Sequence, residues 1–128
     1  EAGIHADIAV SLPQPLPMQE IDLCALFANS LDNAIEACMA LPHASRRLSV
    51  RARADKGLLM VRIRNRTADR SPLVPGCLPE STKADRSQHG LGLRSLKEIT
   101  ARYQGSLSLQ RAHGMFELLV TIPLSQKP

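Results

Sequence analysis

The sequence predicts an α/β fold, a two-layer sandwich in which helices cover one face of a mixed β-sheet. Three observations lead to this fold class. Two segments carry apolar residues at helical spacing, five shorter segments alternate apolar with polar residues, and no internal repeat is visible. Each alternating segment has one polar face, so we expect helices on only one side of the sheet. The 128 residues suit one domain, 1–128.

Composition narrows the class of protein. Hydrophobic residues make up 44% of the chain and aromatic residues only 2%, so the core must be aliphatic. The formal net charge of +4 is too small to predict nucleic acid binding by itself, and stacking with bases would lack aromatic partners. No apolar run approaches the roughly 20 residues of a membrane span.

The cysteines indicate the redox state of the chain, and the first residues indicate whether it is part of a longer protein. Cys24, Cys38 and Cys77 form an odd set without a close pair, which favours reduced thiols over a disulfide framework or a zinc knuckle. The chain begins Glu1-Ala2-Gly3 without an initiator methionine, so we expect a piece of a longer protein.

The first half of the chain predicts a strand and a helix. Residues 4–10 alternate and suit an edge strand, and three prolines within residues 13–17 then force an extended connector. Asp22 is a suitable N-cap for a helix that continues to about Leu41. Its apolar residues at helical spacing are Leu23, Leu26, Phe27, Leu31, Ala34, Ile35 and Cys38.

The second half predicts two hairpins with a long loop and a helix between them. Residues 47–54 and 58–65 alternate around a turn at Gly57, and their arginines are expected on the wet face. Residues 67–89 are polar, carry three prolines and have little periodicity, which is typical of a functional or disordered loop. Gly90 opens the second helix, and residues 105–123 form the last hairpin.

The first helix carries an unusual polar set. Asn29, Asn33 and Glu36 are spaced i, i+4 and i+7, so they share one face. An amide oxygen is a hard ligand that suits Mg²⁺. The alternative is an ordinary solvated helix edge.

Two further signals could bind a ligand. The pair Gly90 and Gly92 at a helix start would let backbone N–H groups approach an anion, although neither the Walker nor the Rossmann pattern is present. Asn65 lies on the inward side of its strand, where it needs a hydrogen-bond partner such as a ligand edge. The alternatives are a flexible hinge with a helix cap, and a strand that has simply ended.

The order and spacing of these signals resemble a known family. Residues 29–37 closely resemble the N box of the ATP-binding domains of sensor histidine kinases, in the gyrase, chaperone and histidine kinase (GHKL) ATPase superfamily. Residues 89–93 resemble their second glycine box, and residues 103–107 and 116–123 their closing hairpin. The resemblance covers nearly the whole chain and implies the Bergerat-type fold. It is closest to the peptide-pheromone-sensing receptor kinases, which share the Lys83, Asp85 and His89-to-Leu93 run.

The resemblance implies a role for each residue of an Mg·ATP site. Asn33 would hold Mg²⁺ through its side-chain oxygen, and Asn29 would lie by the phosphates. Backbone N–H groups of the second glycine box would cradle the phosphates. Residues 67–89 would be the ATP lid, poorly ordered over 70–88 without nucleotide. The residues expected to bind ATP are Asn29, Asn33, Asn65, Lys83, His89, Gly90, Leu91, Gly92 and Leu93.

Two positions of the resemblance are informative. In hydrolytic members a Glu four residues before the magnesium Asn activates water, but this chain has Asn29 there, which cannot act as a general base. Most of the family reads Asp-x-Gly-x-Gly after the second strand, with the Asp bonding the adenine amino group. This chain has Asn65 without either glycine, as the pheromone-receptor subgroup has Asn, and the Asn65 oxygen can accept that bond.

The resemblance also implies partners. Family members phosphorylate a histidine on a separate dimerisation domain, and the phosphoryl group then passes to a response regulator. His5 sits on an expected strand, and His43 and His113 sit in turns, so none suits the acceptor, and no catalytic residue is expected in this chain. The expected setting is the cytoplasmic side of a membrane-anchored bacterial receptor, without direct membrane contact and without nucleic acid.

Two other functions compete with the kinase interpretation. One is a serine protein kinase of the anti-sigma-factor type on the same fold. The other is a non-catalytic binding module: one that binds ATP, or one that uses an arginine face on nucleic acid. A solvated sheet face explains those arginines better than nucleic acid does. They are Arg47, Arg51, Arg53, Arg62 and Arg64.

Overall fold

The structure is a computed structural model that describes residues 3–12, 18–68 and 86–124, with only the backbone path for residues 86–92. The elements follow the predicted order of strand, helix, hairpin, helix and hairpin. They are β1 (His5–Ser11), α1 (Glu20–Met39), a short 3-10 turn η1 (His43–Ser45), β2 (Arg47–Asp55), β3 (Leu58–Arg66), α2 (Arg86–Arg102), β4 (Ser106–Ala112) and β5 (Met115–Pro123).

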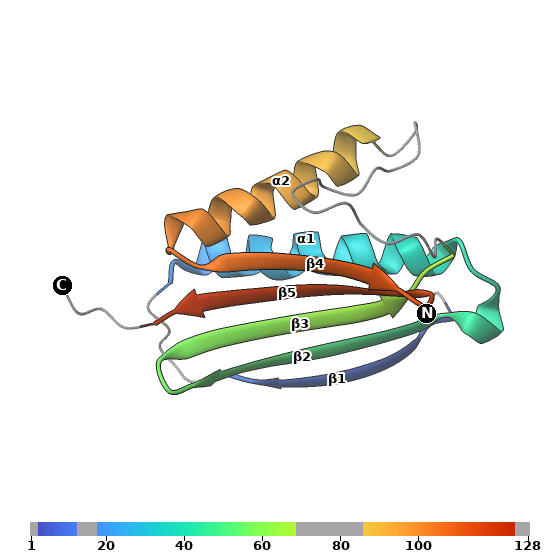
Figure 1. Cartoon of the computed structure of the whole chain (residues 1–128), viewed down its shortest axis with the longest axis horizontal. Coiled ribbons are helices and arrows are strands. Elements are labelled where there is room, and N and C mark those ends of the chain that lie inside the picture. The colour runs from blue at the N-terminus through green and yellow to red at the C-terminus, as the bar shows by residue number, and fades with distance from the viewer. Residues whose placement is uncertain (1–2, 13–17, 69–85, 125–128) are drawn as a thin grey trace.

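The strands form one mixed sheet, which confirms the predicted fold class. Their order is β1-β2-β3-β5-β4, with β1 parallel to β2 and the other neighbours antiparallel. Both helices lie on the same side of this sheet and run along it, as Figure 1 shows. The opposite face carries no helix from the described residues, so the domain has two layers.

Strand alternation accounts for the core. The buried positions of β2, β3 and β5 recur at every second residue and face the buried stripes of both helices. Both predicted hairpin turns are present, because Gly57 and Gly114 adopt positive φ angles of 76° and 77°. The largest fully buried apolar side chains are Leu26, Leu59, Val61, Ile63, Leu96, Leu118, Val120 and Ile122.

The ends of α1 differ from the sequence prediction. α1 begins at Glu20 and ends at Met39, and its N-cap is Gln19, which makes no side-chain capping bond. Asp22 lies inside the first turn and is buried, so its prediction as the N-cap is wrong. The physical reason is tertiary, since partners from α2 hold this carboxylate. Ile35, one of the periodic apolar residues, is 38% exposed.

The edge strand β1 is exposed along its whole length. Ile8 and Val10 pair in register with Val50 and Ala52, so they point to the helical side of the sheet. α1 packs on β2 and β3 and does not cover Ile8 and Val10. Ile8 is therefore 63% exposed. The prediction of an edge strand is therefore confirmed.

Candidate functional site

An ion pair and a hydrogen bond fix how the two helices lie against each other. Arg102 Nη1 donates to Asp22 Oδ1 at 2.6 Å, and the Tyr103 hydroxyl donates to Asp22 Oδ2 at 2.5 Å. The same hydroxyl accepts the backbone N–H of Gln19 at 3.1 Å. These bonds join the start of α1 to the end of α2, so the helices run antiparallel, side by side (Figure 1).

This antiparallel pairing brings two predicted site elements to the same end of the domain. Asn33 lies about three helical turns after Asp22, and Gly92 lies about three turns before Arg102. A turn rises about 5.4 Å, so both positions lie roughly 15 Å from the ion pair. The N box and the glycine segment therefore lie at the same level on neighbouring helices.

The end of β3 reaches the same end of the sandwich. Asn65, the penultimate residue of β3, pairs with Leu48 at the start of β2 and with Phe116 at the start of β5. The Cys38 thiol at the end of α1 lies 3.4 Å from the carbonyl oxygen of Arg47, next to Leu48. Asn65 therefore lies beneath the C-terminal half of α1, the half that carries Asn33.

Asn65 has an unusual hydrogen-bonding state. Its side chain is 1% exposed on the inward face, as the sequence predicted. Its amide nitrogen donates to the carbonyl oxygen of Arg66 at 2.9 Å, whereas its Oδ1 atom has no hydrogen-bond partner among the described residues. A buried acceptor without a partner costs about 1–3 kcal/mol, so this oxygen is an available acceptor for a ligand donor.

The N-box side chains lie at the border of the buried stripe of α1. Asn29, Asn33 and Glu36 are all half-buried, while Ser30 and Ala34 beside them are buried. The Ser30 hydroxyl donates to the carbonyl oxygen of Leu26 at 2.6 Å, so a polar side chain is accommodated within this helix. The shared polar face predicted from spacing is therefore present, next to the core and open to solvent.

The glycine segment, Gly90 to Gly92, does not begin α2 as predicted. α2 begins at Arg86, so Gly90, Leu91 and Gly92 are inside the helix and the expectation that Gly90 opens it is wrong. Backbone N–H groups at these positions are directed to carbonyl oxygens one turn earlier in the helix, so they are not the unpaired N–H groups of a helix start. Leu93 is buried in the core, so its side chain contributes packing.

Part of the predicted lid lies outside the described residues. Lys83 is there, as is most of the segment expected to be poorly ordered, and Arg86–Gln88 belong to α2. The structure does show where this segment leaves the sheet. The Thr67 N–H donates to the carbonyl oxygen of Gly114 at 2.9 Å, which joins the end of β3 to the β4–β5 turn.

The helix-joining cluster was not predicted from the sequence. It consists of Asp22, Arg102, Tyr103 and Gln19. The hydrogen bond from Tyr103, with that of Arg102, lowers the pKa of Asp22, and burial together with the Asp22 carboxylate raises the pKa of Tyr103. Its only sequence signal is an acidic residue in the first turn of one helix and an Arg-Tyr pair at the end of the other.

The histidines and cysteines lie largely as expected. His5 begins β1, and His43 and His113 are exposed in turns. Cys24 and Cys38 are free thiols, and Cys77 lies outside the described residues. No helix among the described residues combines the length and hydropathy needed to cross a membrane.

The fold is a five-stranded mixed sheet with two helices on one face, and Asn33 and Asn65 lie toward the same end of it. Residues 18–123 match the sequence model of the GHKL domain. The chain therefore belongs to the GHKL domain family. No curated protein matches the chain in sequence.

Solved structures of histidine kinase catalytic domains have the same fold. The histidine kinase domain of an Erythrobacter litoralis blue-light-activated kinase superposes with a TM-score of 0.70 at 17% identity, covering 98% of this chain and 54% of that one. The mycobacterial sensor histidine kinase MprB gives 0.64 at 19%, covering 95% and 83%. Full-length ShkA in complex with AMPPNP gives 0.66 at 18%, covering 98% and 27%. The chain thus spans about half or less of the longer of these structures.

Proposed function

We propose that this chain is the catalytic, ATP-binding domain of a sensor histidine kinase. In this proposal it binds Mg·ATP and donates the γ-phosphoryl group to a histidine on a dimerisation domain of the parent protein. The phosphoryl group then passes to a response regulator. The observation that carries the proposal is the buried Asn65 Oδ1, which has no hydrogen-bond partner among the described residues and lies at the same end of the domain as Asn33.

Asn65 supplies the expected adenine contact. An amide oxygen accepts from the adenine amino group, whose N–H is a donor. Because the Asn65 nitrogen already bonds the Arg66 carbonyl, the side-chain orientation is fixed with the oxygen available. The AMPPNP bound by ShkA carries the same adenine ring, which supports this assignment.

Asn33 is the residue that would hold Mg²⁺. This ion prefers few protein oxygen ligands together with water and phosphate oxygens. The half-buried Asn33 amide fits that chemistry. Within the part of the chain that the structure describes, no three His, Cys, Asp or Glu side chains gather to hold a metal. When bound, the ion neutralises charge on the phosphates.

The transfer step needs positioning rather than a general base in this chain. The bond between Pγ and its bridging oxygen to the β-phosphate breaks, an N–P bond forms to the acceptor imidazole, and ADP leaves. Asn29 stands where the hydrolytic relatives have Glu, and an amide cannot take a proton from water. This position favours transfer over hydrolysis.

Calorimetric titration of ATP with Mg²⁺ tests the proposal. We expect Asn33→Ala to weaken ATP binding at least about tenfold in the presence of Mg²⁺ and to affect Mg²⁺-free binding less. Asp32→Asn is the matched control, because Asp32 is the exposed neighbour on the same helix. Equal affinities for wild type and Asn33→Ala would refute the metal assignment, and absence of any ATP binding would refute the proposal as a whole.

A further inference from the structure

The sheet face opposite the helices carries an excess of positive charge. On this face every second residue of β2 from Arg47 and of β3 from Arg62 is polar or charged, which confirms the predicted arginine face. Asp7, Asp55 and Glu117 are the carboxylates of the same face. Its arginines are Arg47, Arg51, Arg53, Arg62, Arg64 and Arg66.

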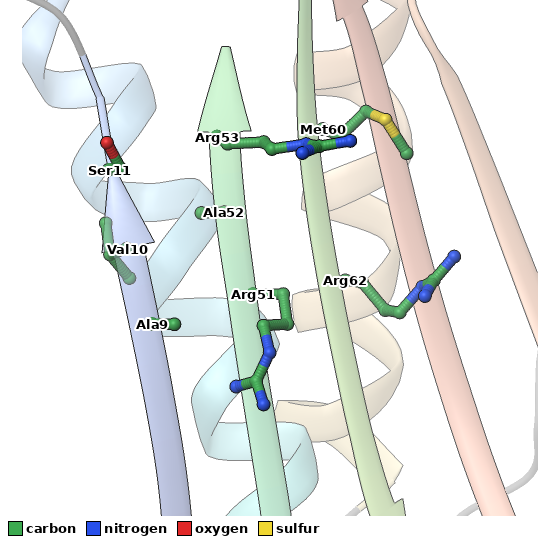
Figure 2. A pocket seen from close by; sticks show the side chains of 8 residues that line it. All are labelled: Ala9, Val10, Ser11, Arg51, Ala52, Arg53, Met60 and Arg62. Atoms are coloured by element: carbon green, nitrogen blue, oxygen red, sulfur yellow. The ribbon is translucent and has the colours of Figure 1, made fainter. Parts of the chain in front are cut away.

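A hollow of about 540 Å³ lies on this face across the first three strands of the sheet. Figure 2 shows its side chains rising from β1, β2 and β3 on the side away from the helices. The Arg53 side chain extends across β3 beside Met60, and Arg62 extends toward β5. On this face the hollow is lined by Ala9, Ser11, Arg51, Arg53, Met60 and Arg62, and Val10 and Ala52 also line it.

The arginines of this face already bind carboxylates of the chain itself. Arg51 Nη2 lies 2.8 Å from Asp7 Oδ2, and its hydrogen bond lowers the pKa of that carboxyl. Glu117 lies between Arg64, at 3.3 Å, and Arg62, at 3.8 Å. The spacing of the guanidinium groups therefore suits carboxylates.

Two arginines of the hollow retain binding capacity. Among the described residues, Arg53 has no carboxylate partner. The Arg62 contact with Glu117 involves its Nε atom at a long 3.8 Å. A guanidinium group has five N–H donors, so both side chains can bind further carboxylate oxygens. Met60, which pairs with Arg53 and lies two residues from Arg62, offers apolar surface beside them.

The side chains of the hollow favour a polypeptide as the occupant. Guanidinium groups and the Met60 side chain lie side by side on the exposed face, so they suit a segment that carries both carboxylate and apolar side chains. The face has no aromatic residue on which bases could stack, and its three carboxylates would repel a continuous array of phosphates. The same carboxylates would repel an anionic membrane surface.

We propose that this hollow is a docking site for an extended, carboxylate-rich segment of a protein partner. Acidic side chains of the segment bind Arg53 and Arg62, and an apolar side chain between them packs on Met60. The site is on the opposite side of the sheet from the nucleotide site, so the two can be occupied together.

Fluorescence anisotropy with a short labelled peptide of the pattern Glu-Ser-Leu-Ser-Glu tests this docking site, because every second residue of an extended segment faces the same side. We expect Arg53→Gln and Arg62→Gln each to weaken peptide binding by about three- to tenfold. Lys97→Gln is the matched control, because it removes the same charge from an exposed position of α2 and should leave affinity nearly unchanged. Equal losses in Arg53→Gln and Lys97→Gln would mean that only net charge matters, and would overturn the site.

A second peptide tests the apolar contact. We expect Met60→Gln to weaken the glutamate–leucine peptide but not a peptide with serine in place of leucine. Tighter binding of single-stranded DNA or of phosphatidylserine vesicles, with loss in the same arginine variants, would overturn the choice of a polypeptide. ATP titrations of these variants should match the wild type, so failure of this site is distinguishable from failure of the nucleotide site.

Discussion

Tyr103 donates a 2.5 Å hydrogen bond to the carboxylate of Asp22 and accepts the N–H of Gln19, the N-cap of α1. The Tyr103 hydroxyl, directly after α2, thus accepts a backbone N–H at the start of α1. The side chain of the N-cap residue, Gln19, makes no capping bond. Because two elements of the proposed nucleotide site lie on these helices, this junction positions the N box relative to the glycine segment.

Replacing Tyr103 with Phe removes both bonds while keeping the ring. We expect the midpoint of thermal unfolding to fall by a few degrees, and amide exchange at Gln19 and in the first turn of α1 to become faster. Arg102→Gln is the control, because it removes the ion pair but keeps the hydroxyl. Unchanged exchange at Gln19 in the Phe variant would contradict the capping role.

The Asp22 carboxylate gives the junction a defined pH dependence. Its pKa is lowered in the folded state, chiefly by the Tyr103 hydroxyl, so the unfolded state binds more protons at acid pH. Its stabilisation is present above the unfolded pKa of about 4 and is lost as the pH falls through the lower folded value. We expect the stability difference between wild type and Asp22→Asn to be largest near neutral pH and to shrink in acid. A constant difference in denaturant unfolding over that range would contradict this sign.

The unpartnered Asn65 oxygen predicts opposite effects on stability and binding. Asn65→Leu removes a buried acceptor that has no partner among the described residues, so we expect the ligand-free domain to gain about 1 kcal/mol of unfolding free energy. The same change should weaken ATP binding at least about tenfold. Denaturant unfolding and calorimetry measure the two effects. A variant that loses stability while keeping ATP affinity would show that Asn65 is purely structural.

Periodicity predicted most of the fold, because it reports which side of an element is buried. The inward position of Asn65 followed from its place after Leu59, Val61 and Ile63 in a strict alternation. Helix ends were harder to predict. Asp22 has the residue type of an N-cap, yet Arg102 and Tyr103, distant in sequence, bind it within the first turn.

The candidate site was predictable only as separate signals. Spacing along one helix places Asn29 and Asn33 on one face. The placement of Asn65, Asn33 and Gly92 at one end of the domain depends on the antiparallel packing of the helices on the sheet, which a single sequence does not encode locally. The open-face hollow likewise requires the register of three strands.

Gly105 connects α2 to β4 and lies so close to the backbone of β5 that no Cβ fits there. Its N–H donates to the carbonyl oxygen of Thr100 at 2.7 Å, and a Cβ at this position would collide with the Thr121 carbonyl oxygen. We expect Gly105→Ala to cost about 2 kcal/mol or more in denaturant unfolding. Gly57→Ala is the matched comparison, because a Cβ there meets nothing within 4 Å and only its φ of 76° is strained, costing about 1 kcal/mol. A smaller loss for Gly105→Ala than for Gly57→Ala would contradict the collision.

The start of α2 predicts a change in the backbone on nucleotide binding. Gly90 and Gly92 lie inside the helix, where their N–H groups are directed to carbonyls one turn earlier and each glycine weakens the helix by about 1 kcal/mol. For these groups to contact phosphates, the first turn must open. We expect AMPPNP with Mg²⁺ to cause the largest amide chemical-shift changes at Gly90 and Gly92, with loss of helical carbon shifts over Arg86–His89. If the changes instead concentrate at Arg86–Gln88 and the helix persists, the N–H groups of the existing first turn bind the phosphates.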